Sequence, residues 1–204
     1  MNTNTKTFLH VGCGPKTKSG TTKEFSQETW TELRLDIDPS VSPDIIGSMT
    51  NMSSVPDETI DAIYSSHNIE HLYAHEVPTA LREFWRVLKP NGYAIITCPD
   101  VQAICALVAD DKLLEPIYMS AVGPITPMDM LWGWRPAIAA GNTFMSHKTG
   151  FTLRILAAAL VNAGFKSIAH ARRAAPHLDL WIAASKSDLT QQELIELAQQ
   201  HFPL

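Results

Sequence analysis

The chain has 204 residues, the size of a single domain, and its 45% hydrophobic and 18% charged residues are typical of a globular protein with a packed core. These proportions exclude a disordered, collagen-like or coiled-coil protein. The formal net charge of -5 provides no general attraction to nucleic acid or anionic lipid, so we expect neither as a main partner. We expect one domain over residues 1–204.

The first residues of the sequence are polar and lack the pattern of a secretion signal, and no apolar run is long enough to cross a membrane. Three cysteines, Cys13, Cys98 and Cys105, fit neither a disulfide framework nor paired zinc ligands. We therefore expect a cytoplasmic protein that does not contact a membrane.

Strands and helices are predicted to alternate along the chain. Apolar runs that end at turn residues predict strands over 8–11, 33–37, 44–46, 60–65, 93–98, 165–169 and 178–184. Apolar spacing and capping residues predict helices over 24–33, 77–88, 99–112, 152–164 and 190–201, the first on the weakest pattern. This alternation predicts an α/β protein with a parallel sheet covered by helices on both faces, and ligands bind such sheets beyond the carboxyl ends of the strands.

A glycine turn and an acidic residue follow the first two predicted strands. Gly12 and Gly14 allow the backbone to approach a ligand closely because they carry no Cβ atom. Asp36 follows Gly14 by 22 residues, close to the roughly 20-residue offset at which a carboxylate accepts hydrogen bonds from ribose hydroxyls. A plain tight turn and a capping carboxylate are the structural alternatives. The agreement of the two signals favours a nucleoside site.

Four segments together resemble the class I S-adenosylmethionine-dependent methyltransferases: 9–14, 35–39, 55–67 and 86–92. The third resembles the family's segment that leads into strand four, and the fourth resembles its leucine-lysine-proline-glycine turn before strand five. The resemblance implies a Rossmann-like, seven-stranded, mostly parallel sheet whose last strand is antiparallel. It also implies S-adenosylmethionine as the cofactor.

The same resemblance implies a cofactor site, for which the candidates are His10, Gly12, Cys13, Gly14, Asp36, Ile37, Ser48, Met49 and Ser66. Three positions depart from the family pattern. His10 stands where an acid is usual, and Lys16 stands where a third glycine is usual. Ser48 lies where an acid often binds the adenine amino group, so its hydroxyl or a backbone carbonyl would accept instead. Met49 packs either on the adenine or in the ordinary core.

The segment His67–His71 also matches H-x-x-E-H, the inverted zinc-protease pattern. Two histidines four residues apart on a helix can share a face and bind zinc, which makes a zinc hydrolase through His67, Glu70 and His71 the third hypothesis. The segment directly follows a predicted strand, however, and its flanks belong to the methyltransferase pattern. We therefore expect no metal, a capping or packing role for Glu70 and His71, and His67 as a base beside the transferred methyl.

Residues 113–150 lack regular periodicity and combine four prolines with several aromatic residues. A long segment of this kind in a compact domain is usually functional, and its aromatic content disfavours disorder. We predict a substrate lid, with a covered sheet edge or a homodimer contact as the alternative. Candidate substrate-binding residues are Tyr118, Trp132, Trp134, Arg135 and Lys148, and His147 is the second candidate base.

The sequence thus predicts an S-adenosylmethionine-dependent methyltransferase that acts on a small-molecule or sugar-like acceptor, with a homodimer as a possible assembly. The alternative hypothesis is a non-catalytic module of the same fold that keeps the nucleoside pocket and binds a partner through its aromatic segment. A methyl transfer from a sulfonium needs no covalent enzyme intermediate, so the protein mainly has to position the reactants and exclude water.

Overall fold

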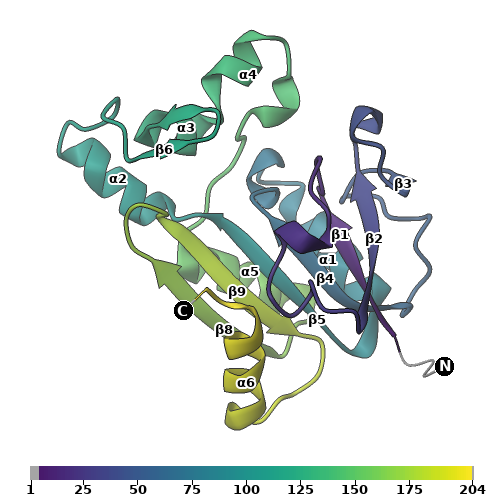
Figure 1. Ribbon diagram of the computed structural model, residues 1–204. Coiled ribbons are helices and arrows are strands. Elements are labelled where there is room, and N and C mark those ends of the chain that lie inside the picture. Colours follow the sequence, from purple (N-terminus) through teal and green to yellow (C-terminus); the bar gives the residue numbers. More distant parts are fainter. Residues whose placement is uncertain (1–4, 204) are drawn as a thin grey trace.

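The structure is a computed structural model that describes residues 5–203. A seven-stranded sheet lies at its centre, in the order β3-β2-β1-β4-β5-β9-β8 (Figure 1). Its strands are β1 (Lys6–Val11), β2 (Trp30–Asp36), β3 (Ile45–Ile46), β4 (Ile60–Ser66), β5 (Leu88–Pro99), β8 (Ser167–Arg173) and β9 (Asp179–Ser185). Only β9, the last strand in the chain, runs antiparallel to its neighbours in this sheet of the described residues. The predicted fold class is confirmed.

Helices cover both faces of the sheet, as predicted. The α-helices are α1 (Val77–Val87), α2 (Val101–Ala109), α3 (Pro127–Trp132), α4 (Arg135–Ala139), α5 (Leu153–Ala163) and α6 (Gln191–His201). Helices α1 and α5 pack on one face, where the apolar stripe of α1 is buried, and α6 packs on the other (Figure 1). Burial of these apolar stripes is the main stabilising contribution to the layered architecture.

Capping residues begin or end three of the predicted helices. The Asp100 carboxylate accepts hydrogen bonds from the backbone at the start of α2, and Thr190 and Glu193 form a capping box at the start of α6. Gly164 ends α5 in a left-handed conformation with φ 109°, which glycine adopts without the steric cost of a Cβ atom.

The helix predicted over 24–33 is wrong, because residues 21–29 form turns and β2 begins at Trp30. Phe25 and Trp30, five residues apart, would lie roughly 140° apart around a helix. In the structure both rings lie on the same side, 5.0 Å apart between centroids, and Phe25 stacks on Phe8 at 4.4 Å. Aromatic packing against the sheet therefore overrides the weak helical pattern.

Residues 113–150 contain short regular elements that the sequence analysis did not predict. A hairpin of β6 (Tyr118–Ser120) and β7 (Gly123–Ile125) precedes α3, α4 and a 3-10 turn at Thr143–Met145. This segment, from here on called the cap, lies beyond the carboxyl ends of the central strands (Figure 1). It is anchored there because Met130 packs in a small apolar cluster with Ile104 of α2.

Within residues 5–203, no helix combines the length and the apolar character that crossing a bilayer requires.

The cysteines of this part of the chain are all unpaired.

His201 is a buried histidine at the end of α6 that binds two hydroxyl groups. Its Nδ1 lies 2.9 Å from Thr22 Oγ1 and its Nε2 lies 3.0 Å from Tyr93 Oη. Its ring is 3% exposed, and burial lowers the pKa of His201 to about 3. The folded protein therefore holds this imidazole neutral.

We expect the free energy of unfolding to fall as the pH drops from 7 to 5. Below about pH 6.5 His201 is protonated in the unfolded chain, whereas in the folded chain it stays neutral down to about pH 3. Each pH unit between these two values therefore lowers the free energy of unfolding by about 1.4 kcal/mol. Urea unfolding at pH 7 and pH 5 measures the effect. The His201→Gln variant should lose about 2 kcal/mol less stability than the wild type over this interval; an equal loss would contradict the prediction.

Candidate active site

A cavity of about 370 Å³ opens beyond the carboxyl ends of β1, β2 and β4, within the roughly 300–1,000 Å³ range of small-molecule sites. Its walls come from the turn after β1, the end of β2, the segment after β4 and the cap. These segments are far apart in sequence. They meet because the parallel strands of the sheet all end at the same edge.

The turn after β1 needs glycine for a steric reason. Gly12 has φ 64°, and a Cβ atom built on it would lie 2.0 Å from Nδ2 of Asn68. Asn68, the second residue after β4, is buried against the turn and lines the same cavity. Its Nδ2 is buried and has no hydrogen-bond partner in the described chain, so the protein leaves one donor unsatisfied beside the cavity. The sequence analysis missed Asn68, although its place directly after a strand end was a usable signal.

Asp36 joins the ends of β1 and β2. One carboxylate oxygen, Oδ2, accepts a hydrogen bond from Gly14 N at 2.8 Å, and Oδ1 accepts one from Asp38 N at 2.9 Å. Each oxygen keeps a further lone pair, so the carboxylate can also accept hydroxyl groups. Space next to Gly14 is open, since a Cβ atom there would meet nothing within 4 Å. The cavity, the carboxylate and the free Asn68 amide therefore suit a nucleoside that carries a polar tail.

The two departures from the family pattern near this turn have structural explanations. Lys16 stands where a third glycine is usual, and its carbonyl accepts a hydrogen bond from Arg34 Nε, while Arg34 Nη2 binds Gly14 O at 2.6 Å. Arg34 therefore fixes the turn. His10 points away from the cavity, where its Nδ1 lies 2.7 Å from Glu32 Oε1. The prediction that His10 faces the cofactor does not agree with this orientation, because alternate residues of β1 face opposite sides of the sheet.

The remaining candidate cofactor residues divide into two groups. Ile37, Ser48 and Met49 line the cavity. Ser66 instead pairs its hydroxyl with Thr97 Oγ1 at 2.9 Å on β5, and Cys13 is buried under the turn. Burial raises the pKa of the Cys13 thiol to about 11, so it stays protonated at neutral pH.

His67 lines the cavity and is protonated at neutral pH. Its Nδ1 is 3.5 Å from Glu70 Oε1 and its Nε2 is 3.6 Å from Asp179 Oδ2. Desolvation acts to lower the pKa of His67, but the carboxylates of Asp179 and Glu70 raise it to about 9. The predicted role as a neutral base at pH 7 conflicts with this charge state.

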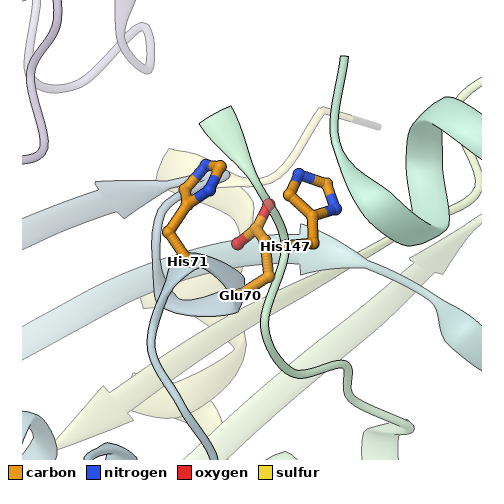
Figure 2. Close-up of side chains that lie close together, drawn as sticks. All are labelled: Glu70, His71 and His147. Carbon is orange, nitrogen blue, oxygen red and sulfur yellow. The ribbon is translucent and has the colours of Figure 1, made fainter. Parts of the chain in front are cut away.

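His147 has the opposite electrostatic character. Burial lowers its pKa, although the Glu70 carboxylate acts to raise it, so the ring is neutral at pH 7. His147 Nδ1 donates a hydrogen bond to Met130 O at 2.9 Å. Figure 2 shows His147 and His71 on either side of the Glu70 carboxylate. The two rings lie 4.9 Å apart between centroids. The cap thus brings one histidine next to the segment after β4.

The H-x-x-E-H segment does not form the helical face that a zinc protease needs. His67 has φ 49° and precedes a 3-10 turn at Ile69–His71, so His67 and His71 do not stack one helical turn apart. The cluster that the structure assembles consists of Glu70, His71 and His147 instead of His67, Glu70 and His71.

Of the predicted substrate-binding residues, Lys148 lines the cavity. The other four belong to the cap but do not line the cavity: Tyr118 lies in β6, Trp132 at the end of α3, Trp134 before α4 and Arg135 at the start of α4. Arg135 Nε binds Asp129 Oδ1 at 2.8 Å, which explains its position without a substrate. The other cap residues that line the cavity are Asn142, Phe144 and Met145, and the structure alone identifies them as a group.

Comparison with known proteins agrees with this architecture. The methyltransferase domain family matches residues 9–96, while no curated protein matches the chain by sequence. A methyltransferase described as S-adenosylmethionine-dependent, from Methanosarcina mazei, has a similar structure with 16% identity and a TM-score of 0.59, over 90% of this chain and 93% of that one. A protein from Bordetella parapertussis described as a "possible exported protein" has 19% identity and a TM-score of 0.60, over 90% of this chain and 62% of that one.

A third similar structure is a 1,6-didemethyltoxoflavin-N1-methyltransferase from Burkholderia thailandensis, solved with 1,6-didemethyltoxoflavin and S-adenosylhomocysteine bound. It has 14% identity and a TM-score of 0.56, over 89% of this chain and 71% of that one. Identities this low carry information on the fold alone. The methyltransferase domain family matches residues 9–96, and the strand order with the antiparallel β9 of the described sheet is that of the Rossmann-like methyltransferase fold.

Proposed function

We propose that this protein transfers a methyl group from S-adenosylmethionine to a small-molecule acceptor. The observation that carries the proposal is that one cavity joins the Asp36–Gly14 contact at one end to the His67–His71 segment at the other. A nucleoside bound at the Asp36–Gly14 end would point its amino-acid tail toward the His67–His71 segment. The small-molecule ligand of the similar Burkholderia enzyme supports the acceptor class.

The cofactor supplies an electrophilic methyl carbon on a sulfonium sulfur. When bound, it would transfer this methyl group to a nucleophilic atom of the acceptor. Asp36 would hold the ribose hydroxyls and Met49 would pack on the adenine. The Asn68 amide would lie near the amino-acid end, and Phe144 and Met145 of the cap would help to exclude water.

His67 and His147 have different roles in this proposal. His67 is protonated at neutral pH, so it attracts and orients an electron-rich acceptor instead of taking its proton. His147 is neutral, and because its Nδ1 donates to Met130 O, its Nε2 carries a lone pair that can take a proton, next to His71, which lines the cavity. Lys148 adds a second cation at the cavity wall.

The alternatives are less favoured by the same observations. A non-catalytic module does not require an open cavity that runs from the nucleoside end to a charged histidine. A zinc hydrolase through His67, Glu70 and His71 is disfavoured because the segment is a 3-10 turn in a methyltransferase fold. A cytoplasmic location and a homodimer stay predictions from the sequence.

Calorimetry with S-adenosylhomocysteine tests the first step, with one binding site per chain and a Kd in the micromolar range or below as the expected result. Formation of S-adenosylhomocysteine from S-adenosylmethionine across a panel of hydroxylated and amine acceptors tests the second. Absence of binding would refute the methyltransferase proposal. Binding without turnover on every acceptor would instead favour the non-catalytic module.

A further inference from the structure

Glu70, His71 and His147 form a compact set of potential metal ligands. One ligand atom from each residue lies within 4.8 Å of the other two (Figure 2). Two imidazole nitrogens and one carboxylate oxygen are the donors that zinc, iron and other first-row divalent metals share, and three protein ligands leave coordination positions open.

The Glu70 carboxylate is unusual because it is buried without hydrogen bonds. The side chain is 1% exposed, and neither carboxylate oxygen has a hydrogen-bond partner among residues 5–203. Its contact with His67 Nδ1, at 3.5 Å, is longer than a normal hydrogen bond. A buried carboxylate is costly unless it is paired or coordinates a metal, and the protonated His67 ring approaches only Oε1, at 3.5 Å. Glu70 therefore keeps lone pairs that no hydrogen bond of the described residues uses.

Both histidines are oriented as metal ligands are. His71 Nδ1 lies 3.1 Å from Ser146 O and His147 Nδ1 lies 2.9 Å from Met130 O. A carbonyl oxygen only accepts, so each Nδ1 carries the hydrogen and each Nε2 keeps a free lone pair. Metal-binding histidines typically donate their other ring N–H to a backbone carbonyl in this way, which fixes both the tautomer and the ring orientation.

The backbone holds the two halves of the set together. Lys148 N and Thr149 N donate to Glu70 O at 2.9 and 3.2 Å, and His147 N donates to Trp132 O at 3.2 Å. The cap is thus tied directly to the segment after β4 at the residues that carry the ligands. Ligands on a connected backbone lose little freedom when they bind a metal, which favours binding.

We propose that Glu70, His71 and His147 bind one divalent first-row transition metal ion at the wall of the cavity. Of the three ligands His71 lines this cavity, so an ion bound between them would border the space proposed for the acceptor. A metal ion of this kind binds oxygen atoms and lowers the pKa of a bound hydroxyl group. The acceptor class that follows, which rests on the proposed methyltransferase function, is a small molecule that offers a hydroxyl or carboxylate oxygen to the metal. His147 then acts as a ligand and not as the proton acceptor.

The test uses the 204-residue chain, stripped with a chelator and then titrated with Co²⁺, Zn²⁺ or Mg²⁺ alone. We expect one Co²⁺ or Zn²⁺ per chain by elemental analysis after dialysis, visible absorption from bound Co²⁺, and at least tenfold weaker binding of Mg²⁺. Co²⁺ at about 100 times its Kd should raise the Tm by about 5 to 10 °C. Failure of the wild type to retain Co²⁺ or Zn²⁺, or equal binding of Mg²⁺, would overturn the proposal.

Ligand variants locate the site. Glu70→Gln and His147→Gln should each weaken Co²⁺ binding about 100-fold or more, and circular dichroism confirms that they fold. His75→Gln, which replaces an exposed histidine near the same segment, should bind like the wild type. If either ligand variant misfolds, His71→Asn serves in its place. Unchanged binding in the folded ligand variants would overturn the site.

S-adenosylhomocysteine binding is measured on the same samples with and without Co²⁺. Cofactor binding without metal uptake overturns the metal site alone. Metal uptake without cofactor binding refutes the proposed methyltransferase, and with it the acceptor class, but supports the ligand set.

Discussion

Replacement of Asp36 with asparagine is expected to weaken the binding of S-adenosylhomocysteine about 100-fold or more. The carboxylate accepts hydrogen bonds from Gly14 N and Asp38 N, and its remaining lone pairs face the cavity in which the ribose would bind. Hydrogen bonds to a charged group contribute about 1.5 to 3 kcal/mol each. Asparagine keeps the shape but offers only one acceptor oxygen, and its NH₂ group would oppose a backbone N–H donor.

Calorimetry on the wild type, Asp36→Asn and Asp188→Asn measures the effect. Asp188 is a matched control because its side chain is 83% exposed and its 3.6 Å ion pair is with Lys166, away from the cavity. The control should bind like the wild type. A change of less than tenfold in a folded Asp36→Asn protein would show that the carboxylate does not bind the ribose.

The Gly12→Ala variant is expected to lose about 2 to 5 kcal/mol of unfolding free energy. A left-handed conformation costs an alanine roughly 1 to 2 kcal/mol, and forcing the added carbon into a packed site costs about 1 to 3 kcal/mol more. The collision is with the Asn68 side chain, 2.0 Å from the position of the added Cβ. Gly14→Ala is a close comparison, because φ is 52° but the space is open, and it should lose only about 1 to 2 kcal/mol.

Urea unfolding without ligand measures both variants, and a second substitution identifies the cause. Asn68→Ala removes the colliding amide, so Gly12→Ala should cost less in the Asn68→Ala background than in the wild type. An undiminished cost in that background would mean that the collision with Asn68 does not explain the need for glycine.

Much of the fold follows from local patterns in the sequence. The stripe of α1, the capping residues of α2 and α6, and the glycine at the end of α5 are short-range signals, and the structure agrees with each of them. The turn after β1 and Asp36 were also identifiable, because both directly follow a strand and strand ends of a parallel sheet share one edge. The helix predicted over 24–33 was wrong because long-range aromatic packing outweighed a weak local pattern.

Some features of the candidate site also follow from the sequence, whereas others depend on the tertiary structure. The sequence by itself determined the methyltransferase architecture and the pairing of the turn after β1 with Asp36, since these depend on residues that lie next to strand ends. Only the tertiary structure decided that Asn68 packs on Gly12, that His67 is a cation between two carboxylates, and that His147 joins Glu70 and His71. These features depend on how the cap folds back over the sheet, and neither periodicity nor spacing along the chain encodes the distance between such remote segments.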